Sequence, residues 1–479
     1  MNRREAVKLF GAGGLGLFLA SRMSAAKALN SILSGGDLTK EMFGKDFKWG
    51  TATAAYQIEG AHNIDGKGES IWDRFTANPK HVKTHENGNV ACDFYHLYET
   101  DLKLMKEMNF GNFRFSTAWA RILPEGIGKV NQKGLDFYHR MIDFCIELGI
   151  EPWLTLYHWD LPQALQDKGG WVNRDIVSWF NEYTDVVTRS LGGKVKNWMV
   201  LNEPVSFIGG GYLAGIHPPG HINLKEGIAG SHHAVLCQAE GARVIRANVP
   251  GANIGTTFSC AHIDPKNTKH MHEKAAEKLD ALSNRLFIEP ALGMGYPTDV
   301  LPFFKKVGKY MKDGDEQKMK FDFDFIGLQN YTRFVARFAL IPPVIWANMI
   351  PAKKVTKEEL NEMGWEIYPK GIYEILKQFS KYPIKNFILT ENGVAVKDKV
   401  EDGKVHDAKR TQFFKDYLAY VLKAKNEGIN VNGYFVWSLM DNFEWAEGYR
   451  PKLGLVAVDF KTQQRIIKDS GLWFKEFLK

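Results

Sequence analysis

Cysteine is scarce in this sequence, and the few cysteines form no metal-binding motif. The chain has only Cys92, Cys145, Cys237 and Cys260, and none of them belongs to a Cys-x-x-Cys pair. This spacing argues against a zinc site and favours buried free thiols, with one disulfide left open. The adjacent His232 and His233 have no partner at metal-ligand spacing. We therefore predict no metal and no cofactor.

The sequence also lacks the features of a nucleic-acid-binding protein. The net charge is +7, but lysine and arginine are mixed with acidic residues along the chain. No arginine-rich arm and no recognition motif is present, so the positive charge indicates a solvated surface rather than a nucleic-acid partner.

No apolar run is long enough to span a bilayer as a helix, so we expect no membrane contact from the mature protein. The N-terminus has Arg3 and Arg4 before a Gly-rich apolar run at residues 9–20, and small residues end at Ala28. This order resembles a twin-arginine export signal. We predict a signal peptide at residues 1–28, a linker at 29–42 and a periplasmic location. The alternative is a frayed amphipathic N-terminus on a cytoplasmic protein.

Eight short apolar runs alternate with longer helix-like segments. The predicted strands are residues 48–54, 112–116, 152–157, 198–202, 253–258, 325–330, 386–390 and 432–437. The predicted helices include residues 92–108, 132–148, 174–191, 224–248, 370–380, 407–426 and a closing helix at 463–478. Alternation of this kind predicts an α/β protein with parallel strands, and eight repeats predict a (β/α)8 TIM barrel.

No linker divides residues 43–479, so we predict one catalytic domain. Residues 261–321 and 332–366 are too long for simple connections. Both are predicted to be loop insertions at the rim of the barrel, where functional elaboration usually occurs.

Polar residues that end barrel strands are the candidates for chemistry, because TIM-barrel active sites lie at the C-terminal face. Asn202-Glu203-Pro204 ends the fourth predicted strand, and Glu391-Asn392-Gly393 ends the seventh. Each motif alone is weak, because a Glu before Pro often just ends a strand and Glu-Asn-Gly is often a turn. Together they supply the two carboxyl groups that glycoside hydrolysis requires. Their separation, which decides between retention and inversion, does not follow from sequence.

The chain after the N-terminal segment resembles glycoside hydrolase family 1, the β-glucosidase family. The resemblance is carried by motifs at residues 47–60, 114–116, 158–162, 201–204, 364–369, 390–393 and 437–445. It implies that Glu203 is the general acid/base and Glu391 the nucleophile. It further implies substrate contacts from Gln57, His158, Asn202, Tyr331, Trp365, Trp437, Glu444 and Trp445, and support of the nucleophile by Arg114 and Tyr331. Taken alone, His158, Trp437, Arg114 and Gln57 also admit purely structural roles.

Two positions bear on the chemistry. Gln329 stands where the family usually has asparagine, so its contact near the nucleophile is left open. Glu444 and Trp445 stand where members that act on 6-phosphorylated sugars carry a phosphate clamp. Since a carboxylate repels phosphate, a neutral sugar is predicted. The charge of Glu391 should also raise the pKa of Glu203 above its ordinary value, as a general acid requires.

The predicted function is hydrolysis of terminal β-D-glucosyl residues from a small β-glycoside or short oligosaccharide, with retention. A β-galactosidase, a β-fucosidase or a transglycosylase of the same family shares every catalytic residue and stays open. A non-catalytic sugar-binding barrel is disfavoured because both carboxylates are present. An unrelated barrel enzyme would need a glycine-rich phosphate loop or a metal cluster. The sequence does not fix the oligomeric state.

Overall fold

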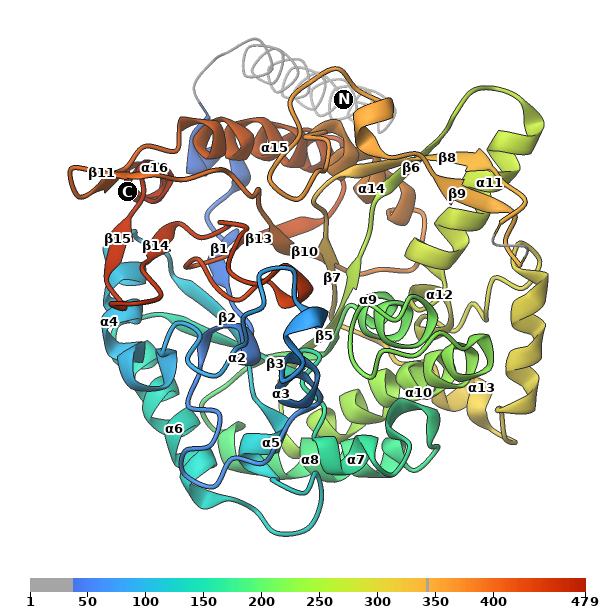
Figure 1. The fold of residues 1–479 in the computed structure, drawn as a ribbon, viewed down its shortest axis with the longest axis horizontal. Helices are drawn as coiled ribbons and strands as arrows, with labels where there is room; N and C mark the ends of the chain where they lie inside the picture. Colours follow the sequence, from blue (N-terminus) through green and yellow to red (C-terminus); the bar gives the residue numbers. More distant parts are fainter. Residues whose placement is uncertain (1–37, 342–343) are drawn as a thin grey trace, which may run out of the picture.

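The computed structural model describes residues 38–341 and 344–479, and its centre is a closed barrel of eight parallel strands (Figure 1). The order around the barrel is β1-β13-β10-β7-β5-β4-β3-β2, so barrel strands that follow one another in the chain lie side by side. Their bounds are β1 (Lys48–Ala52), β2 (Asn112–Ser116), β3 (Glu151–Tyr157), β4 (Asn197–Asn202), β5 (Asn253–Ser259), β7 (Phe325–Gln329), β10 (Phe387–Asn392) and β13 (Val431–Trp437). The predicted TIM barrel is confirmed.

Long helices cover the outside of the barrel (Figure 1). They are α4 (Phe94–Glu107), α6 (Gln132–Glu147), α8 (Ile176–Leu191), α10 (Leu224–Asn248), α14 (Lys370–Phe379), α15 (Ala408–Asn426) and α16 (Asp469–Phe477). Shorter helices occupy the connections: α2 (Ala55–Ile58), α3 (Ile71–Thr76), α5 (Trp119–Ile122), α7 (Gln163–Gln166), α9 (Pro204–Ile208), α12 (Ile288–Ala291) and α13 (Asp315–Lys318). Most of the long helices bury one apolar stripe, as the 3.6-residue period requires, but residues 227–239 of α10 are buried on every side.

The start of the closing helix differs from the prediction. Residues 465–467 form strand β15 (Arg465–Ile467), which pairs antiparallel with β14 (Val456–Val458), and α16 begins only at Asp469. The paired Ile466 and Ile467 are β-branched and fit a strand better than a helix. The prediction of one helix over residues 463–478 was therefore wrong at its start, because this range contains both β15 and α16.

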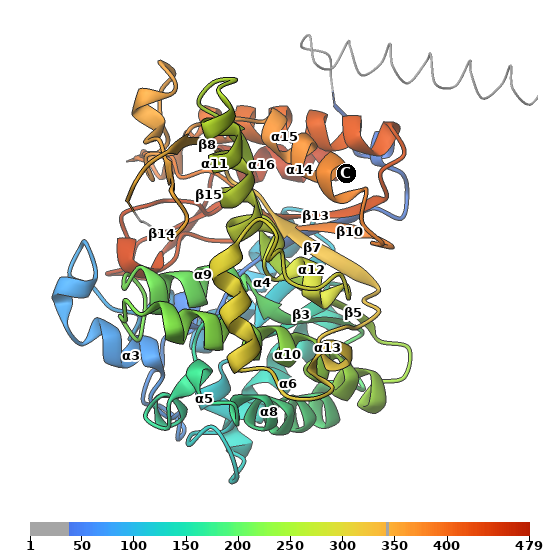
Figure 2. The same ribbon diagram turned by 90° about the vertical axis from the view of Figure 1, so that its right-hand side faces the viewer.

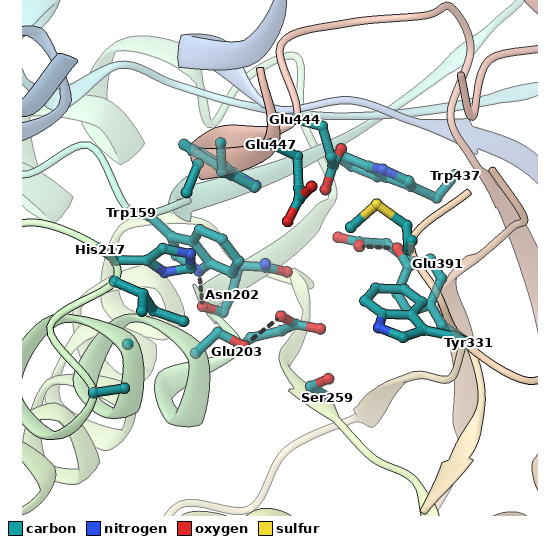
Figure 3. Close-up of a pocket in the computed structure, with 18 of the residues that line it drawn as sticks. Trp159, Asn202, Glu203, His217, Ser259, Tyr331, Glu391, Trp437, Glu444 and Glu447 are labelled. Atoms are coloured by element: carbon teal, nitrogen blue, oxygen red, sulfur yellow. Dashed lines mark hydrogen bonds between the residues drawn. The ribbon is translucent and has the colours of Figure 1, made fainter. Parts of the chain in front are cut away.

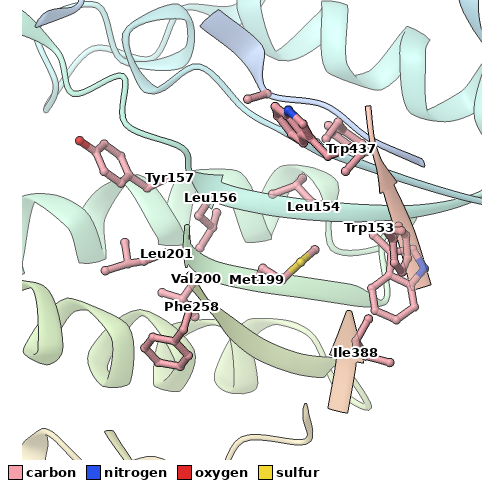
Figure 4. Packing of buried hydrophobic residues seen from close by; sticks show 14 of the residues in the cluster. Trp153, Leu154, Leu156, Tyr157, Met199, Val200, Leu201, Phe258, Ile388 and Trp437 are labelled. Atoms are coloured by element: carbon pink, nitrogen blue, oxygen red, sulfur yellow. The ribbon is translucent and has the colours of Figure 1, made fainter. Parts of the chain in front are cut away.

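The inside of the barrel is packed in layers. Near the N-terminal ends of the strands, Trp153 packs against Phe325 and Phe435 with ring centroids 5.6 and 5.0 Å away. Because alternate residues of each strand point inward, the next layer up contains Arg114 and Met199, whose Nε and Sδ are 3.2 Å apart. Figure 4 shows the apolar packing around Trp153 and Met199. The interior thus changes from apolar to polar toward the C-terminal ends of the strands.

The two predicted insertions meet in space and form one small subdomain. Strands β6 (His262–Pro265), β8 (Arg333–Phe338) and β9 (Ala347–Met349) make a three-stranded sheet in that order. Helix α11 (His270–Asp280) covers it through Ala275, Ala276 and Leu279, which pack against Ala336 and Ala347. Figure 2 shows α11 and β8 above one side of the barrel. The sequence predicted both insertions but not their pairing.

The predicted signal peptide lies outside the described residues, as does most of the predicted linker. Residues 40–43 form a short 3-10 helix, and Phe43 packs 4.9 Å from Trp49, ring centre to ring centre. All four cysteines are buried as free thiols. Within the described part of the chain, no helix is long and apolar enough to cross a membrane.

Candidate active site

A cavity of about 880 Å³ opens at the C-terminal ends of the barrel strands. The predicted site residues that line it are His158, Asn202, Glu203, Tyr331, Trp365, Glu391, Trp437, Glu444 and Trp445. The other two, Gln57 and Arg114, are fully buried behind its wall. Figure 3 shows Glu203 and Glu391 reaching into the cavity from different sides. The fold therefore brings residues from all of the predicted sequence motifs together around one cavity.

Glu203 directly follows β4 and occupies the position that precedes helix α9. Its side chain is only 6% exposed, and the Ser206 hydroxyl donates a hydrogen bond of 2.7 Å to its Oε2. Burial, followed by the charge of Glu391, raises the pKa of Glu203 to about 8. Glu203 is therefore protonated at neutral pH, the state a general acid needs.

Three non-glycine residues of the cavity wall adopt a left-handed backbone. The φ angles of Trp159, Glu203 and Trp445 are +80°, +44° and +53°. Non-glycine residues rarely adopt positive φ, and such strain persists only where the surrounding structure holds it, often at functional sites. The backbone thus fixes the directions in which these three side chains project.

Glu391 lies near the end of β10 and is surrounded by donors. Arg114 Nη1 donates to its Oε1, and the Tyr331 hydroxyl donates to its Oε2 at 2.7 Å. Burial raises the pKa of Glu391, while Arg114 and Tyr331 oppose that rise. Because the cation lies beside Glu391, the single proton of the pair resides on Glu203 and Glu391 is the carboxylate.

Steric space requires glycine at the last position of Glu391-Asn392-Gly393. A Cβ on Gly393 would lie 1.9 Å from the carbonyl oxygen of Trp437. Only glycine allows this approach between the ends of β10 and β13. The turn after Glu391 and the wall residue Trp437 are thereby held together.

Gln329 takes part in the site despite its departure from the family pattern. Its Nε2 is 2.7 Å from Glu391 Oε1 and 2.7 Å from Asn202 Oδ1. The longer amide thus adds a neutral donor to the nucleophile candidate from β7. The contact left open by the sequence is present.

Asn202 connects several parts of the site. Its Oδ1 accepts from Arg114 Nη2 at 2.6 Å and from Thr257 Oγ1 at 2.8 Å, in addition to Gln329. Its Nδ2 lies 2.9 Å from His158 Nε2. With the amide as donor, His158 Nε2 is the acceptor and its Nδ1 carries the hydrogen. Burial, together with Arg114, lowers the pKa of His158 and keeps the ring neutral.

The loop after β13 forms another wall of the cavity, and its Trp445 ring stacks 6.0 Å from the His158 ring, centroid to centroid. Gln57 Nε2 donates to Asn442 Oδ1 at 3.0 Å, to the Phe443 carbonyl at 2.9 Å and to Glu444 Oε2 at 3.3 Å. Burial and the charge of Glu391 raise the pKa of Glu444 to about 8. Gln57 thus positions this loop from behind, and its predicted contact with substrate stays a prediction.

Aromatic rings complete the cavity. The ring centroids of Trp445 and Trp159 are 4.6 Å apart, and those of Trp437 and His158 are 5.8 Å apart. On the far side, the Trp365 ring centroid is 5.9 Å from that of Tyr331. Flat apolar faces of this kind suit the faces of sugar rings.

Sequence reasoning missed several lining residues, including Trp159, Ser206, His217 and Ser259. Trp159 belongs to the motif at residues 158–162 and could have been taken from it. Ser206 lies three positions after Glu203, a spacing that brings side chains together once a helix starts there. His217 and Ser259 had no sequence signal.

Among the residues that the structure describes, no group of three or more His, Cys, Asp or Glu side chains has the arrangement of a metal site. His232 contacts Asp315 and Tyr296 through its two ring nitrogens, at 2.8 and 2.9 Å. His232, which the sequence analysis excluded as a metal ligand, thus belongs to a buried network around the Arg174–Asp315 ion pair.

Comparison with known proteins agrees with this architecture. The model of glycosyl hydrolase family 1 matches residues 39–479. The chain belongs to glycosyl hydrolase family 1. It is 44% identical over 449 residues to beta-glucosidase A of Acetivibrio thermocellus, which covers 92% of this chain and 99% of that protein. It is also 35% identical to the 6-phospho-beta-glucosidase GmuD of Bacillus subtilis, covering 91% and 97% of the two chains.

Solved structures of family 1 superpose closely. The family 1 β-glucosidase from Thermotoga maritima has a TM-score of 0.86 and 41% identity, covering 91% of this chain and 97% of that one. The same enzyme in complex with glucoimidazole also has a TM-score of 0.86 at 41% identity, with 90% and 97% coverage. The chain is therefore a glycoside hydrolase with the TIM barrel of its family.

Proposed function

We propose that this family 1 hydrolase is a β-glucosidase that removes terminal non-reducing β-D-glucosyl residues with retention of configuration. The observation that carries the proposal is the asymmetric pair of buried carboxyl groups. Glu203 has a pKa raised to about 8, whereas Glu391 lies beside the Arg114 guanidinium. One acid and one carboxylate in a shared cavity are the two groups that glycoside hydrolysis needs, and membership of glycosyl hydrolase family 1 supports the double-displacement mechanism.

In the first step, Glu391 attacks the anomeric carbon and forms a glycosyl ester while the bond to the leaving oxygen breaks. Glu203 gives its proton to that oxygen, so the aglycone departs as a neutral alcohol. Tyr331 and Arg114 hold Glu391 by its two carboxylate oxygens. They orient the nucleophile and keep it ionised until it reacts.

In the second step, burial still raises the pKa of Glu203, but the contribution from the charge of Glu391 is gone because Glu391 has become an ester. The pKa of Glu203 falls and the residue ionises. It then accepts a proton from water, the water oxygen attacks the anomeric carbon, and Glu391 leaves as a carboxylate. The two inversions give net retention, and Glu203 ends the cycle protonated.

The choice of glucose rests on the relatives named beta-glucosidase and on the character of the loop after β13. Glu444 places a carboxyl group in the cavity, and its ionised form repels the phosphate of a phosphorylated sugar. The neutral side chain of Gln57 contacts it at 3.3 Å. These features support a free sugar over the 6-phosphorylated sugar for which GmuD is named.

The test is the initial rate on p-nitrophenyl β-D-glucoside, β-D-galactoside and β-D-fucoside for wild type and Glu391→Ala. We expect fastest cleavage of the glucoside, with β-glucose as first product by NMR. Glu391→Ala should lose at least about 10⁴-fold in kcat. Added azide should restore turnover and yield α-glucosyl azide, because the small anion replaces the missing nucleophile.

The alternatives give different results in the same assays. Faster cleavage of galactoside or fucoside would change the sugar. Transfer to an added alcohol in place of hydrolysis would identify a transglycosylase. Binding of glucose without turnover of any substrate would contradict the enzymatic proposal.

A further inference from the structure

Ser206 lies one helical turn after Glu203 and bonds to its carboxyl group. Its Oγ donates to Glu203 Oε2 over 2.7 Å, and it lines the cavity itself. We propose that Ser206 is a positioning residue for Glu203, which fixes the carboxyl orientation and favours the proton on the oxygen that faces the leaving group. This inference rests on the proposed function, in which Glu203 is the acid/base.

The local backbone makes the contact possible. Glu203 precedes helix α9, Pro204 is its first residue, and the Ser206 N–H donates to the Glu203 carbonyl at 2.9 Å. A residue at this position usually caps the helix by accepting from the backbone N–H of the second or third residue. The Glu203 side chain makes no such capping bond. It accepts from the Ser206 side chain instead, so the carboxyl group is held beside the helix rather than across its end.

The hydrogen bond distinguishes the two carboxyl oxygens. Oε2 accepts the Ser206 hydroxyl hydrogen, so the acidic proton of Glu203 resides on Oε1 when Ser206 is the donor. One dashed line in Figure 3 ends on Glu203, and Ser259 is seen near the other side of the same carboxyl. A fixed rotamer with a defined proton position matters for proton transfer, because the acid must lie within hydrogen-bond reach of the leaving oxygen.

The hydroxyl also moderates the electrostatics of Glu203. The charged and titratable groups around it come from several strands and from the loops that follow them: Arg114, His217, Cys260, Tyr331, Glu391 and Glu444. Burial and Glu391 raise the pKa of Glu203, while Ser206, Ser259 and Arg114 lower it. A donor to the ionised form therefore helps Glu203 to release its proton and to act as base in the second step.

The experiment compares Ser206→Ala with Ser206→Thr, which keeps the hydroxyl. The measurement is the pH dependence of kcat/KM on a methyl β-glucoside, whose leaving group needs the acid, and on 2,4-dinitrophenyl β-glucoside, whose leaving group does not. Ser206→Ala should move the basic limb for the methyl glucoside upward by about one pH unit. At its optimum pH, the kcat/KM of Ser206→Ala on the methyl glucoside should fall about tenfold. Its kcat/KM on the dinitrophenyl glucoside should fall less than about threefold.

Ser206→Thr should restore both the position of the limb and the ratio of the two rates. Equal losses on both substrates with an unmoved limb would overturn the proposal, because that pattern indicates a merely structural role. An unchanged Ser206→Ala profile would overturn it as well. A thermal melt of each variant separates misfolding from these outcomes. If wild type cleaves neither substrate, the proposed function itself is contradicted, which distinguishes that failure from the failure of this inference.

Discussion

Two buried carboxyl groups in this barrel have opposite proton affinities. Glu203 and Asp315 are 6% and 0% exposed, so burial penalises the charge of both. Yet the pKa of Glu203 is raised to about 8, whereas the pKa of Asp315 lies well below its ordinary value. Burial raises the pKa of both residues, and only the neighbours of Asp315 overcome that rise.

Asp315 begins α13 and is matched by donors on both oxygens. Arg174 donates to both at 2.7 and 2.6 Å, and the Lys312 N–H adds a bond of 2.8 Å. His232 Nε2 lies 2.8 Å away. Burial alone would raise the pKa of Asp315, but these contacts lower it. The charge is thereby compensated, and the residue joins α13 to α10 and to the segment before α8.

Glu203 has hydroxyl donors and a carboxylate neighbour instead of a cation of its own. The nearby guanidinium of Arg114 bonds to Glu391 and Asn202. A buried carboxyl group is a structural anion when a cation forms an ion pair with it, as Arg174 does with Asp315. A buried carboxyl group is a candidate acid when the nearby cation pairs with another carboxylate instead, as Arg114 does with Glu391 beside Glu203.

The largest effect that would sharpen this comparison is on stability. Asp315→Ala leaves Arg174 without its counter-charge and removes the hydrogen-bond partner of His232 Nε2. We expect the free energy of unfolding to fall by about 3–5 kcal/mol, because one partner of a buried ion pair is removed. The kcat/KM of the folded protein should stay within about twofold, since the network lies outside the cavity.

Chemical denaturation measures the first quantity and steady-state kinetics the second. The matched control is the exposed neighbour Asp313, whose change to Ala should alter stability by no more than about 0.5 kcal/mol. A large loss of activity at unchanged stability in Asp315→Ala would contradict the structural role of Asp315.

A smaller effect is expected from Glu203→Gln. In wild type the unfolded chain ionises Glu203 near 4.5, but the folded chain does so only near 8. The stability from keeping this acid neutral is therefore present at low pH and lost as pH rises between those values. Glutamine cannot ionise, so the variant avoids that loss.

Glu203→Gln should exceed wild type in unfolding free energy by about 1–2 kcal/mol at pH 9, and by less at pH 5. The ionised Glu203 of wild type faces the solvent-filled cavity. The stability difference should therefore be smaller than the whole pKa change on folding would give. Denaturation curves at the two pH values measure the difference. A gain that shrinks as pH rises would show that the folded pKa of Glu203 is not raised.

Much of the architecture follows from the sequence. Strand alternation predicted the barrel, and the ends of two strands predicted Glu203 and Glu391 as a pair. These features are local patterns, which a periodicity or a short motif records. The ion pair between Asp264 of β6 and Arg333 of β8 joins residues that are 69 positions apart, and the contact of Gln329 with Glu391 joins residues that are 62 apart. No local pattern contains such contacts.

The roles of buried ionisable groups were the least predictable feature. Glu203 and Asp315 are the same chemical group in similar burial, and their difference comes from Arg114 and Arg174, which lie on other segments of the chain. Ser206 was closer to prediction, because it lies on the helix that starts directly after the residue it contacts. The contact forms, however, only because the Glu203 carboxyl group does not cap helix α9, and the sequence does not show this.

The most direct test of the account is to trap the covalent intermediate. Wild type is incubated with 2,4-dinitrophenyl 2-deoxy-2-fluoro-β-D-glucoside, in which the fluorine slows both steps while the good leaving group keeps formation of the glycosyl ester faster than its breakdown. Intact mass and peptide mapping then locate the label. We predict one 2-fluoroglucosyl group per chain, on the peptide that contains Glu391. A label on Glu203, or time-dependent turnover with no covalent species, would contradict the assignment of Glu391 as nucleophile.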